Sequence, residues 1–438
     1  MSQQQYDNCS MTDTARICVV GLGYVGLPLA CEFAREGHSV SGFDVDPEKV
    51  HTLESGVDPT GDVGDEVIGN TDIEFSSDES VIAGSEYVIV AVPTPVDDQK
   101  KPNLDLVEAA GKSVGHQLEA GSTVVLESTV YPGATSEVFV PALEEASGLK
   151  AGTDFGVGYS PERMVPGDDE HGLRNVTKIV SGLETETRED IASLYESIID
   201  AGVHRSPSIE TAEAAKCVEN TQRDLNIALV NELAVASDHL GLDTQAVLEA
   251  AGTKWNFHDY RPGLVGGHCI PVDPFYLIYE SEQNGFSPEL IRKGREVNEY
   301  VPKHVGEMAV KALNESEKVL KNSRVLVLGL AYKPNVDDIR TSAIGGVIDT
   351  LDEFGVEVVG FDPHADDELM RDQFGIDVQE DLNLEGFDGL VVGTPHDEFH
   401  DLNIAKIVKK MADGPVFIDV DGTFEDRVSN YDFRYWRL

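Results

Sequence analysis

Short apolar runs alternate with helix-length segments through the first part of the chain. An apolar run begins at Arg16, an amphipathic segment follows at residues 27–37, and a second apolar run ends in the sequence FDVD at residues 43–46. This order predicts a strand, a helix and a second strand. Further apolar runs of strand length lie at residues 87–95, 122–130 and 155–161, and a helix-length segment lies at residues 104–118. The alternation predicts an α/β fold with a doubly wound parallel sheet.

The pattern changes at about residue 206, where long stretches rich in Ala and Glu replace the apolar runs and continue to about residue 300. The leading stretch, residues 209–242, keeps a helical composition throughout. A helix of this length is longer than most helices of globular domains. We therefore expect a central helical domain whose long helix bridges two other domains and contributes to a homodimer or higher homo-oligomer.

The α/β pattern returns at Ser323, with a strand predicted at residues 323–333, a helix at 343–355 and a strand at 356–363. This segment is a weak internal repeat of the N-terminal one, which predicts two Rossmann-like domains. The second copy lacks the full glycine motif, so we expect it to hold a nucleotide differently. The expected organisation is a disordered tail at 1–14, a nucleotide-binding Rossmann domain at 15–205, a central helical and dimerisation domain at 206–305, and a second nucleotide-binding Rossmann-like domain at 306–438.

The chain of 438 residues is strongly acidic, with 33 Lys and Arg against 80 Asp and Glu and a formal net charge of −47. Such a charge repels the phosphates of nucleic acids and anionic membrane surfaces, so neither is an expected partner. The acidic residues are spread along the whole sequence, which favours a halophilic protein. That interpretation predicts loss of structure below roughly 0.5 M salt, where screening weakens.

The cysteines are Cys9, Cys18, Cys31, Cys217 and Cys269, and they form no CxxC pair. Neither a zinc site nor a disulfide framework is indicated, which favours a reducing cytoplasm. The first residues lack the basic and apolar regions of a signal peptide, and no apolar run approaches 18 residues. We therefore expect a soluble cytoplasmic protein without a bound metal.

A glycine motif follows the first predicted strand directly and opens a predicted helix. In this context Gly21 makes the tight turn, Gly23 lets a pyrophosphate approach the backbone, and Gly26 permits close helix packing. Asp44 lies at the end of the second predicted strand, where a carboxylate can accept hydrogen bonds from ribose hydroxyls. Its charge would repel a 2′-phosphate, so the motif predicts NAD and not NADP.

Cys269 lies in an unusual segment, residues 254–277, with glycines immediately before the thiol and prolines on both sides. We interpret Gly266 and Gly267 as freeing space above the thiol, and Pro271 and Pro274 as stiffening the loop. A metal site built from His268 and Cys269 is the alternative, but no second pair lies at ligand spacing. The pattern favours a reactive thiol.

The chain resembles the UDP-glucose/GDP-mannose dehydrogenase family from Arg16 to about Arg427. The motifs that carry the resemblance are GLGYVG at 21–26, VPTP at 92–95, ESTVYPG at 127–133, YSPE at 159–162, AAKCVEN at 214–220, GGHC at 266–269 and LAYKPNVDDIRTS at 330–342. The resemblance implies an NAD-dependent oxidation of a sugar CH2OH to a carboxylate in two hydride transfers.

The resemblance also implies roles for individual residues. Cys269 would attack the C6 aldehyde and carry a thiohemiacetal and then a thioester. Lys216 and Asn220, one helical turn apart, would stabilise the oxyanion, with Asp273 beside the thiol. Thr129 and Glu162 would place water and substrate, and Glu162 would act as the base for hydrolysis. A second Glu of the glucose-oxidising branch is replaced here by Pro166.

Ligand contacts are implied in the same way. Lys333 and Arg340 are basic positions in an acidic chain, suited to phosphates. The expected cofactor-binding residues are Gly21, Gly23, Tyr24, Val25, Gly26, Asp44, Thr94, Thr129 and Arg340. The expected substrate-binding residues are Glu162, Arg163, Lys216, Asn220, Arg261, Gly266 and Lys333.

The sugar is less well defined by the sequence. The glucose branch has a Lys before the aspartate, whereas this chain has Val272. The segment looks more like enzymes that act on UDP-N-acetylhexosamines, with UDP-N-acetyl-D-mannosamine favoured and the glucosamine and galactosamine epimers and UDP-glucose as alternatives. A one-step dehydrogenase of the 6-phosphogluconate type and a non-catalytic nucleotide-sugar sensor are more remote alternatives.

Overall fold

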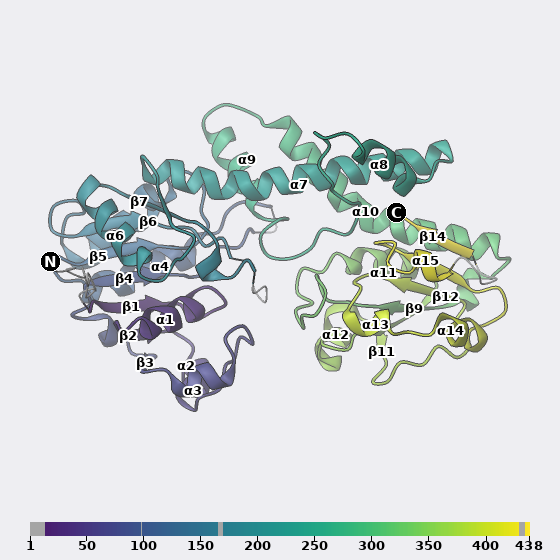
Figure 1. Ribbon diagram of the computed structural model, residues 1–438, viewed down its shortest axis with the longest axis horizontal. Helices are drawn as coiled ribbons and strands as arrows, with labels where there is room; N and C mark the ends of the chain where they lie inside the picture. Colours follow the sequence, from purple (N-terminus) through teal and green to yellow (C-terminus); the bar gives the residue numbers. More distant parts are fainter. Residues whose placement is uncertain (1–13, 98, 165–169, 429–433) are drawn as a thin grey trace, which may run out of the picture. The chain divides into compact units, whose positions relative to one another are not determined.

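The structure is a computed structural model that describes residues 14–97, 99–164, 170–428 and 434–438. The chain divides into two compact units, whose elements are labelled in Figure 1. The first unit contains the residues up to Val218 together with Phe275–Gly285, and the second contains Glu219–Pro274 together with Phe286–Leu438. The predicted tail lies outside the described residues except for Thr14. The predicted domain bounds at residues 205 and 305 remain predictions.

The first unit is built on an eight-stranded sheet within the described residues, in the order β3-β2-β1-β4-β5-β6-β7-β8. Neighbouring strands are parallel except for β6 and β7, an antiparallel pair that the sequence pattern did not predict. The strands are β1 (Arg16–Val20), β2 (Ser39–Phe43), β3 (Ile73–Ser76), β4 (Tyr87–Val90), β5 (Thr123–Leu126), β6 (Gly156–Tyr159), β7 (Lys178–Gly182) and β8 (Val203–Arg205).

Helices cover this sheet and bury its apolar strands. The main helices are α1 (Gly26–Arg35), α2 (Pro47–Glu54), α3 (Asp65–Asn70), α4 (Asp105–Gln117), α5 (Val140–Ser147) and α6 (Thr185–Glu196), with short turns η1 (Glu79–Ile82), η2 (Thr135–Phe139) and η3 (Leu173–Asn175). The apolar run at 87–95 forms a strand only as far as Val90. The run continues with Pro93 and Pro95, which cannot donate to a strand ladder.

Helix α7 (Ile209–Leu240) is continuous over 32 residues, as the sequence predicted. It begins in the first unit and ends in the second. The other long elements of the central region are α8 (Thr244–Gly252), α9 (Asp273–Gln283) and α10 (Glu289–Glu315). Helix α10 continues through Pro302, a residue that usually ends a helix.

The second unit contains a parallel sheet of six described strands in the order β11-β10-β9-β12-β13-β14. The strands are β9 (Arg324–Leu328), β10 (Glu357–Phe361), β11 (Asp377–Val378), β12 (Gly389–Val392), β13 (Val416–Asp419) and β14 (Arg434–Arg437). Its helices are α11 (Ile344–Glu353), α12 (Asp367–Phe374), α13 (Asp397–His400), α14 (Ile404–Lys410) and α15 (Glu425–Val428), with the turn η4 (Leu320–Asn322). The same strand order, third-second-first-fourth-fifth-sixth, occurs in both sheets, which is the Rossmann arrangement. The predicted fold class is confirmed.

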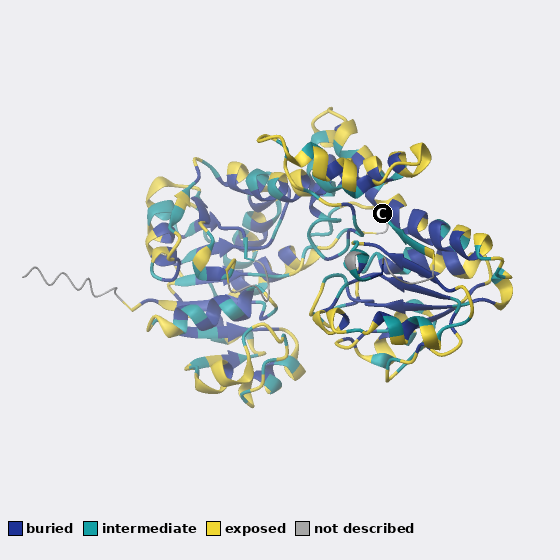
Figure 2. Cartoon of the chain, turned by 45° about the vertical axis from the view of Figure 1, so that its right-hand side comes forward, coloured by how far each residue is buried: buried dark blue, intermediate teal, exposed yellow. Residues whose placement is uncertain are grey.

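Strand β9 shows why the apolar runs could be recognised. Val325 and Val327 pack into a core on one face of the sheet, and Leu326 and Leu328 pack into a separate core on the other. Successive side chains of a strand point to opposite faces, so a strand covered on both sides is apolar throughout. Figure 2 shows the strands of this sheet as buried and the outer faces of the surrounding helices as exposed.

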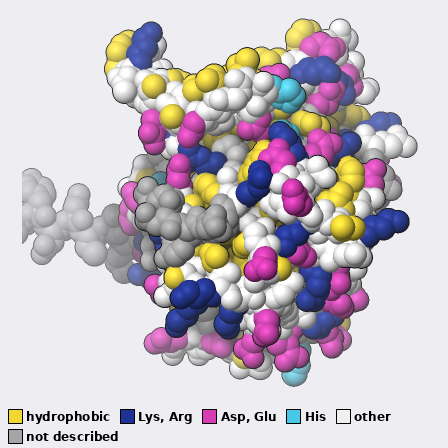
Figure 3. Space-filling model, turned by 90° about the vertical axis from the view of Figure 1, so that its right-hand side faces the viewer, with side chains coloured by type: hydrophobic (Ala, Val, Ile, Leu, Met, Phe, Trp, Pro, Cys, Tyr) yellow, Lys and Arg dark blue, Asp and Glu magenta, His cyan; other side chains and the backbone are white. Residues whose placement is uncertain are grey.

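The acidic side chains are dispersed. On the face drawn in Figure 3, Asp and Glu lie among Lys and Arg and form no single patch. Within the part of the chain that the structure describes, no helix is long and apolar enough to cross a membrane.

Candidate active site

The turn after β1 can be built only with glycine at two of its positions. Gly21 has φ +90°, and a Cβ there would lie 2.5 Å from the carbonyl oxygen of Ala91. A Cβ at Gly26 would lie 1.9 Å from the carbonyl oxygen of Gly21. Gly23 has no atom within 4 Å of its Cβ position. The turn is therefore closed on the protein side and open at Gly23, where a phosphate could approach the backbone.

Asp44 follows β2 directly and lies buried beside this turn. One carboxylate oxygen accepts from the amide of Leu22 at 2.9 Å and pairs with Lys49 Nζ at 2.8 Å, and the other accepts from the amide of Asp46 at 3.0 Å. Lys49 was missed by sequence reasoning, because a Lys on the first turns of a helix is usually a solvated surface charge. The open Gly23 and the fixed Asp44 together fit a dinucleotide.

Two neighbouring loops meet at the same sheet edge. The hydroxyl of Thr94, after β4, donates to the carbonyl of Thr129, after β5, at 2.7 Å. Ser128 ties the same loops together through the backbone of Val92, and Tyr276 donates to the carbonyl of Thr94. Thr94 and Thr129, both predicted at the cofactor, are thus brought together at the carboxyl end of the sheet that also carries Gly21. Tyr24 is partly exposed there, and Val25 precedes α1.

Glu162 belongs to a buried ionic cluster. Lys178 Nζ lies 2.7 Å from Glu127 Oε2 and 3.0 Å from Glu162 Oε2, and the hydroxyl of Tyr195 donates to Glu127 Oε1. Glu162 Oε1 accepts from the amides of Arg163 and of the residue after it, both at 2.6 Å. Of this cluster only Glu162 was predicted as a site residue.

The charges in this cluster shift one another's titration. Burial raises the pKa of Glu127 to about 7, with Lys178 opposing and Glu162 reinforcing the rise. Burial also acts on Glu162, but Lys178 and the two amides outweigh it, so the pKa of Glu162 is lowered. The predicted Arg163 donates from its guanidinium to the carbonyl of Thr177 at 2.5 Å, and Pro166 lies outside the described residues.

Cys269 lies where the chain enters α9. Its carbonyl accepts from the amides of Val272 at 3.0 Å and Asp273 at 2.9 Å, which forms the turn that leads into α9. The residue is half-buried, unlike Cys18, Cys31 and Cys217, which are buried. A helix N-terminus favours an anionic group, so this position suits a thiolate.

Asn220 and Asp273 form a buried pair behind this turn. Asn220 Nδ2 donates to Asp273 Oδ2 at 2.6 Å, and the two residues are 5% and 3% exposed. Lys216, one turn earlier on α7, is 9% exposed and is therefore not a solvated surface Lys. The amide of Asn220 has a second hydrogen to offer a ligand.

The glycines before Cys269 serve a different purpose from the one expected. A Cβ at Gly266 would lie 2.9 Å from the carbonyl oxygen of Thr341, and one at Gly267, which has φ +93°, would lie 3.0 Å from the ring of Tyr332. The interpretation that these glycines free space above the thiol is therefore corrected. They let the Cys269 loop pack closely against the segment from Leu330 to Ser342.

Polar contacts fasten the same two segments. His268 Nε2 pairs with Asp338 at 2.8 Å. The guanidinium of Arg340 donates two hydrogen bonds to the same carboxylate, from Nε and Nη2, each at 3.0 Å. Burial opposes ionisation of Asp338, but these hydrogen bonds lower its pKa overall. Thr341, next to Arg340, has φ +90°, which is a strained conformation for a β-branched residue.

A cavity of about 180 Å³ opens beside this junction in the second unit. The predicted Gly266 and Lys333 both line it, together with Leu264, Ala331, Tyr332, Pro334, Ser342, Ala343, Gly393, Thr394, Pro395 and Asp421. Desolvation and then the charge of Asp419 raise the pKa of Asp421 above its ordinary value. The predicted Arg261 does not line this cavity and instead pairs with Asp259 at 2.9 Å.

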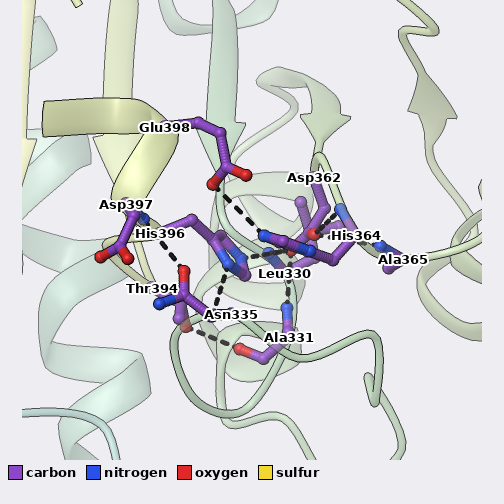
Figure 4. A network of polar contacts seen from close by, with 10 residues as sticks. All are labelled: Leu330, Ala331, Asn335, Asp362, His364, Ala365, Thr394, His396, Asp397 and Glu398. Atoms are coloured by element: carbon purple, nitrogen blue, oxygen red, sulfur yellow. Dashed lines mark hydrogen bonds and ion pairs between the residues drawn. The ribbon is translucent and has the colours of Figure 1, made fainter. Parts of the chain in front are cut away.

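The glycine turn of the second sheet is closed by a carboxylate. Asp362, after β10, accepts from the amides of Leu330, Ala331, His364 and Ala365 and from His396 Nε2, at 2.7 to 3.1 Å (Figure 4). The amide of Asn335 donates to His396 Nδ1 at 2.9 Å, which assigns the proton of His396 to Nε2. Burial opposes ionisation, but His396 and the amides lower the pKa of Asp362 to about 2. Asp362 is saturated with donors, so it is unsuited to holding a ribose as Asp44 could.

A polar network on α7 and α10 holds the backbone of Gly263, six residues before Cys269. Asn231 on α7 exchanges two hydrogen bonds with the backbone of Gly263, at 2.9 and 3.1 Å. Its amide also donates to Asn298 at 2.8 Å, and Asn298 donates to Asp224, which pairs with Arg295 at 2.6 Å. Asp224 and Asn231 lie seven residues apart on α7 and so share one face of the helix, and this spacing is the signal by which the network could have been found. No group of three or more potential metal-ligating side chains occurs among the described residues.

Comparisons with known proteins agree with this geometry. Three domains of the UDP-glucose/GDP-mannose dehydrogenase family match the chain: the NAD binding domain at residues 15–199, the central domain at 210–300 and the UDP binding domain at 326–426. Protein CapL of Staphylococcus aureus is 42% identical over 96% of this chain and 99% of its own length. The UDP-N-acetyl-D-glucosamine 6-dehydrogenase of Pseudomonas aeruginosa is 43% identical over 90% of this chain and 93% of its own. The solved structure of the UDP-D-ManNAc dehydrogenase of Pyrococcus horikoshii has a TM-score of 0.86 and 31% identity, and covers 96% of this chain and 98% of its own.

Proposed function

The chain belongs to the UDP-glucose/GDP-mannose dehydrogenase family and is an NAD-dependent nucleotide-sugar 6-dehydrogenase, and from this premise we propose that it oxidises the C6 hydroxymethyl of a UDP-N-acetylhexosamine to a carboxylate through covalent intermediates on Cys269. The observation that carries the proposal is the half-buried Cys269 in the turn before α9, whose carbonyl accepts from the amide of Asp273, the residue whose side chain pairs with Asn220. A thiol kept only for packing would be expected to be buried like Cys18.

The proposed reaction removes four electrons from C6. The open turn at Gly23 and the carboxylate of Asp44 would hold NAD, which would supply the hydride acceptor for both oxidation steps. The Cys269 thiolate adds to the C6 aldehyde left by the first step and forms a thiohemiacetal, and the second step converts it to a thioester. Water then attacks the thioester carbon, the C–S bond breaks, and the thiol is released with the carboxylate product.

The surrounding polar groups are assigned to the charges that develop. Lys216 and the second amide hydrogen of Asn220 would stabilise negative charge on the C6 oxygen. Asp273 would hold the Asn220 amide in place, since the two are joined at 2.6 Å. Thr129 would help to place the water, and Glu162 would accept its proton.

The substrate's nucleotide is assigned to the second unit. Lys333 and Gly266 line one cavity, and an ammonium group there could offset the negative charge of a diphosphate. Arg340 is 74% exposed while paired with Asp338, so it could reach a ligand phosphate or the cofactor. Arg163 and Arg261 are retained as weaker candidates because each already has a protein partner.

Among the UDP-N-acetylhexosamines, we favour the glucosamine epimer. The resemblance favoured mannosamine, but the Pseudomonas aeruginosa relative named for the glucosamine sugar is 43% identical, and the Pyrococcus horikoshii relative named for the mannosamine sugar is 33% identical. The experiment is to supply the purified protein with NAD and each UDP-N-acetylhexosamine, with UDP-glucose as a further arm, and to count the NADH formed. Two NADH per sugar supports the proposal, whereas one NADH supports a one-step dehydrogenase and none with any sugar supports a sensor.

A homodimer formed through the central helices is also proposed. Leu229 and Leu233 on α7 are 56% and 40% exposed, and Trp255 and Leu290 in the same unit are 91% and 74% exposed. Exposed apolar side chains of this size are typical of an interface. Light scattering should give the mass of a dimer for the wild type and of a monomer for Leu229→Glu with Leu233→Glu, and a monomeric wild type would contradict the proposal.

We further propose a cytoplasmic, salt-adapted enzyme. The net charge of −47 is dispersed over the chain, so its self-repulsion is tolerable where salt shortens the Debye length to about 3 Å at 1 M. The reaction also needs a reduced Cys269. Loss of secondary structure below roughly 0.5 M salt is expected, and full activity in dilute buffer would contradict salt adaptation.

A further inference from the structure

The cluster of Glu127, Lys178, Glu162 and Tyr195 contains more charge than a structural ion pair requires. Glu127 is fully buried, and the Lys178 side chain is 2% exposed. Two carboxylates around one ammonium leave a net charge of −1 in a site almost closed to solvent. Unbalanced buried charge is costly, so the cluster is expected to take up a proton readily.

The geometry orders the cluster from solvent inward. The Glu162 side chain is 11% exposed, while Lys178 and Glu127 behind it are 2% and 0% exposed. Lys178 Nζ lies within hydrogen-bond distance of both carboxylates, at 3.0 Å on the outer side and 2.7 Å on the inner side. A proton arriving at Glu162 therefore has a continuous hydrogen-bonded route to Glu127.

We propose that Lys178 and Glu127 are positioning residues that act through Glu162, with Lys178 relaying to Glu127 the proton that Glu162 removes from the water that hydrolyses the thioester. This inference rests on the proposed function, in which Glu162 is the base. Lys178 also holds the Glu162 carboxylate in place, together with the amides of the two residues that follow it.

The relay balances in protons and electrons. The water O–H bond breaks as its oxygen bonds to the thioester carbon, and its proton goes to Glu162. Lys178 gives one proton to Glu127 and receives that of Glu162, so Lys178 remains an ammonium and Glu162 is again a carboxylate. The C–S bond breaks with its electron pair on Cys269, and the proton on Glu127 later returns to solvent by the same route.

Titration of the groups that face Glu127 supports this direction. These groups are Lys178 on β7, Glu162 after β6, and Tyr195 on α6, whose ring also lies 5.2 Å from Lys178 Nζ. Burial raises the pKa of Glu127 to about 7, whereas the pKa of Glu162 is lowered mainly by Lys178 against the effect of burial. The inner carboxylate is thus the better proton acceptor near neutral pH.

The test measures thioester hydrolysis separately from hydride transfer. The sugar is the UDP-sugar that the enzyme turns over fastest, and the enzyme is used in excess over it. After NAD is added, NADH formation is followed by absorbance. The acyl adduct on Cys269 is followed by mass spectrometry of quenched samples. Glu127→Gln keeps the shape of the side chain but cannot accept the proton. We expect NADH formation at the wild-type rate, hydrolysis slowed by about tenfold, and loss of the inflection near pH 7 in the hydrolysis rate.

Two further variants make the result decisive. Lys178→Arg retains the positive charge but does not release a proton at these pH values, so it should slow hydrolysis as Glu127→Gln does. If Glu127→Gln misfolds and therefore binds NAD poorly, Lys178→Arg still tests the relay. Glu196→Gln, on the exposed end of α6, is the matched control and should behave as the wild type.

Glu162→Gln separates this inference from the proposed function. If Glu162→Gln hydrolyses the adduct at the wild-type rate, Glu162 is not the base, and both its assigned role and the relay are overturned. If Glu162→Gln is slow while Glu127→Gln and Lys178→Arg keep the wild-type rate and pH profile, the relay is overturned and the role of Glu162 stands.

Discussion

The side-chain amide of Asn220 donates a 2.6 Å hydrogen bond to the carboxylate of Asp273, and both residues are buried. Asn220 lies on α7, and Asp273 is the first residue of α9, four positions after Cys269. A buried carboxylate of this kind fixes which hydrogen of the amide remains for a ligand. The orientation of the proposed oxyanion donor therefore depends on Asp273.

Asp273→Asn tests this dependence. The substitution keeps the size of the side chain but removes the charge that orients Asn220, so we expect kcat to fall by about a hundredfold, as when an oxyanion donor is lost. NAD affinity, measured by fluorescence titration, should be unchanged. Glu282→Gln, an exposed position on the same helix, is the control, and wild-type turnover in Asp273→Asn would separate Asp273 from catalysis.

Asn231→Ala tests the anchor of the Cys269 loop. The substitution removes both hydrogen bonds to the backbone of Gly263 and the one to Asn298. Unsatisfied buried groups cost about 1–3 kcal/mol, so chemical denaturation should show a loss of that order. Because the loop carries the nucleophile, kcat should fall more than the affinity for NAD. Asn226→Ala, which loses only a bond within its own helix, should change neither.

The lowered pKa of Asp362 predicts how the free energy of unfolding of the second unit falls at low pH. Its pKa is about 2 in the folded protein against an ordinary value of 3.8, so its stabilising effect is present above about pH 4 and is lost as the pH falls through 2. The contribution is on the order of 2 kcal/mol. Asp362→Asn should be less stable at pH 7 and should lose less stability than the wild type between pH 4 and 2, measured by denaturation at fixed salt. Asp372→Asn, exposed on α12, should keep the wild-type profile, and an unchanged profile in Asp362→Asn would contradict this account.

The sequence predicted the parts of the fold that depend on neighbouring residues. Apolar runs such as β9 and the glycine spacing at Gly21 and Gly26 are local signals, because burial on both faces and a tight turn each leave a mark within a few positions. The 32-residue helix α7 was predictable for the same reason.

The tertiary partners could not be predicted in this way. Lys178 is 51 residues from Glu127 in the sequence, and Asn231 is 32 residues from Gly263. A single Lys on a strand or an Asn on a helix is ordinarily a solvated side chain, so nothing local marked either as buried. The purpose of Gly266 and Gly267 was misjudged for the same reason, since the Tyr332 and Thr341 that they approach lie in a distant segment.

The most direct test of the proposed chemistry is the NADH yield and adduct state of Cys269→Ser against the wild type, with the sugar of highest turnover and excess NAD. The wild type should form two NADH per sugar and show no lasting adduct. Cys269→Ser should bind NAD normally. It should release the uronate far more slowly than the wild type, because an ester on serine is a poorer intermediate than a thioester. Two NADH per sugar at the wild-type rate from Cys269→Ser would contradict the assignment of Cys269 as the nucleophile.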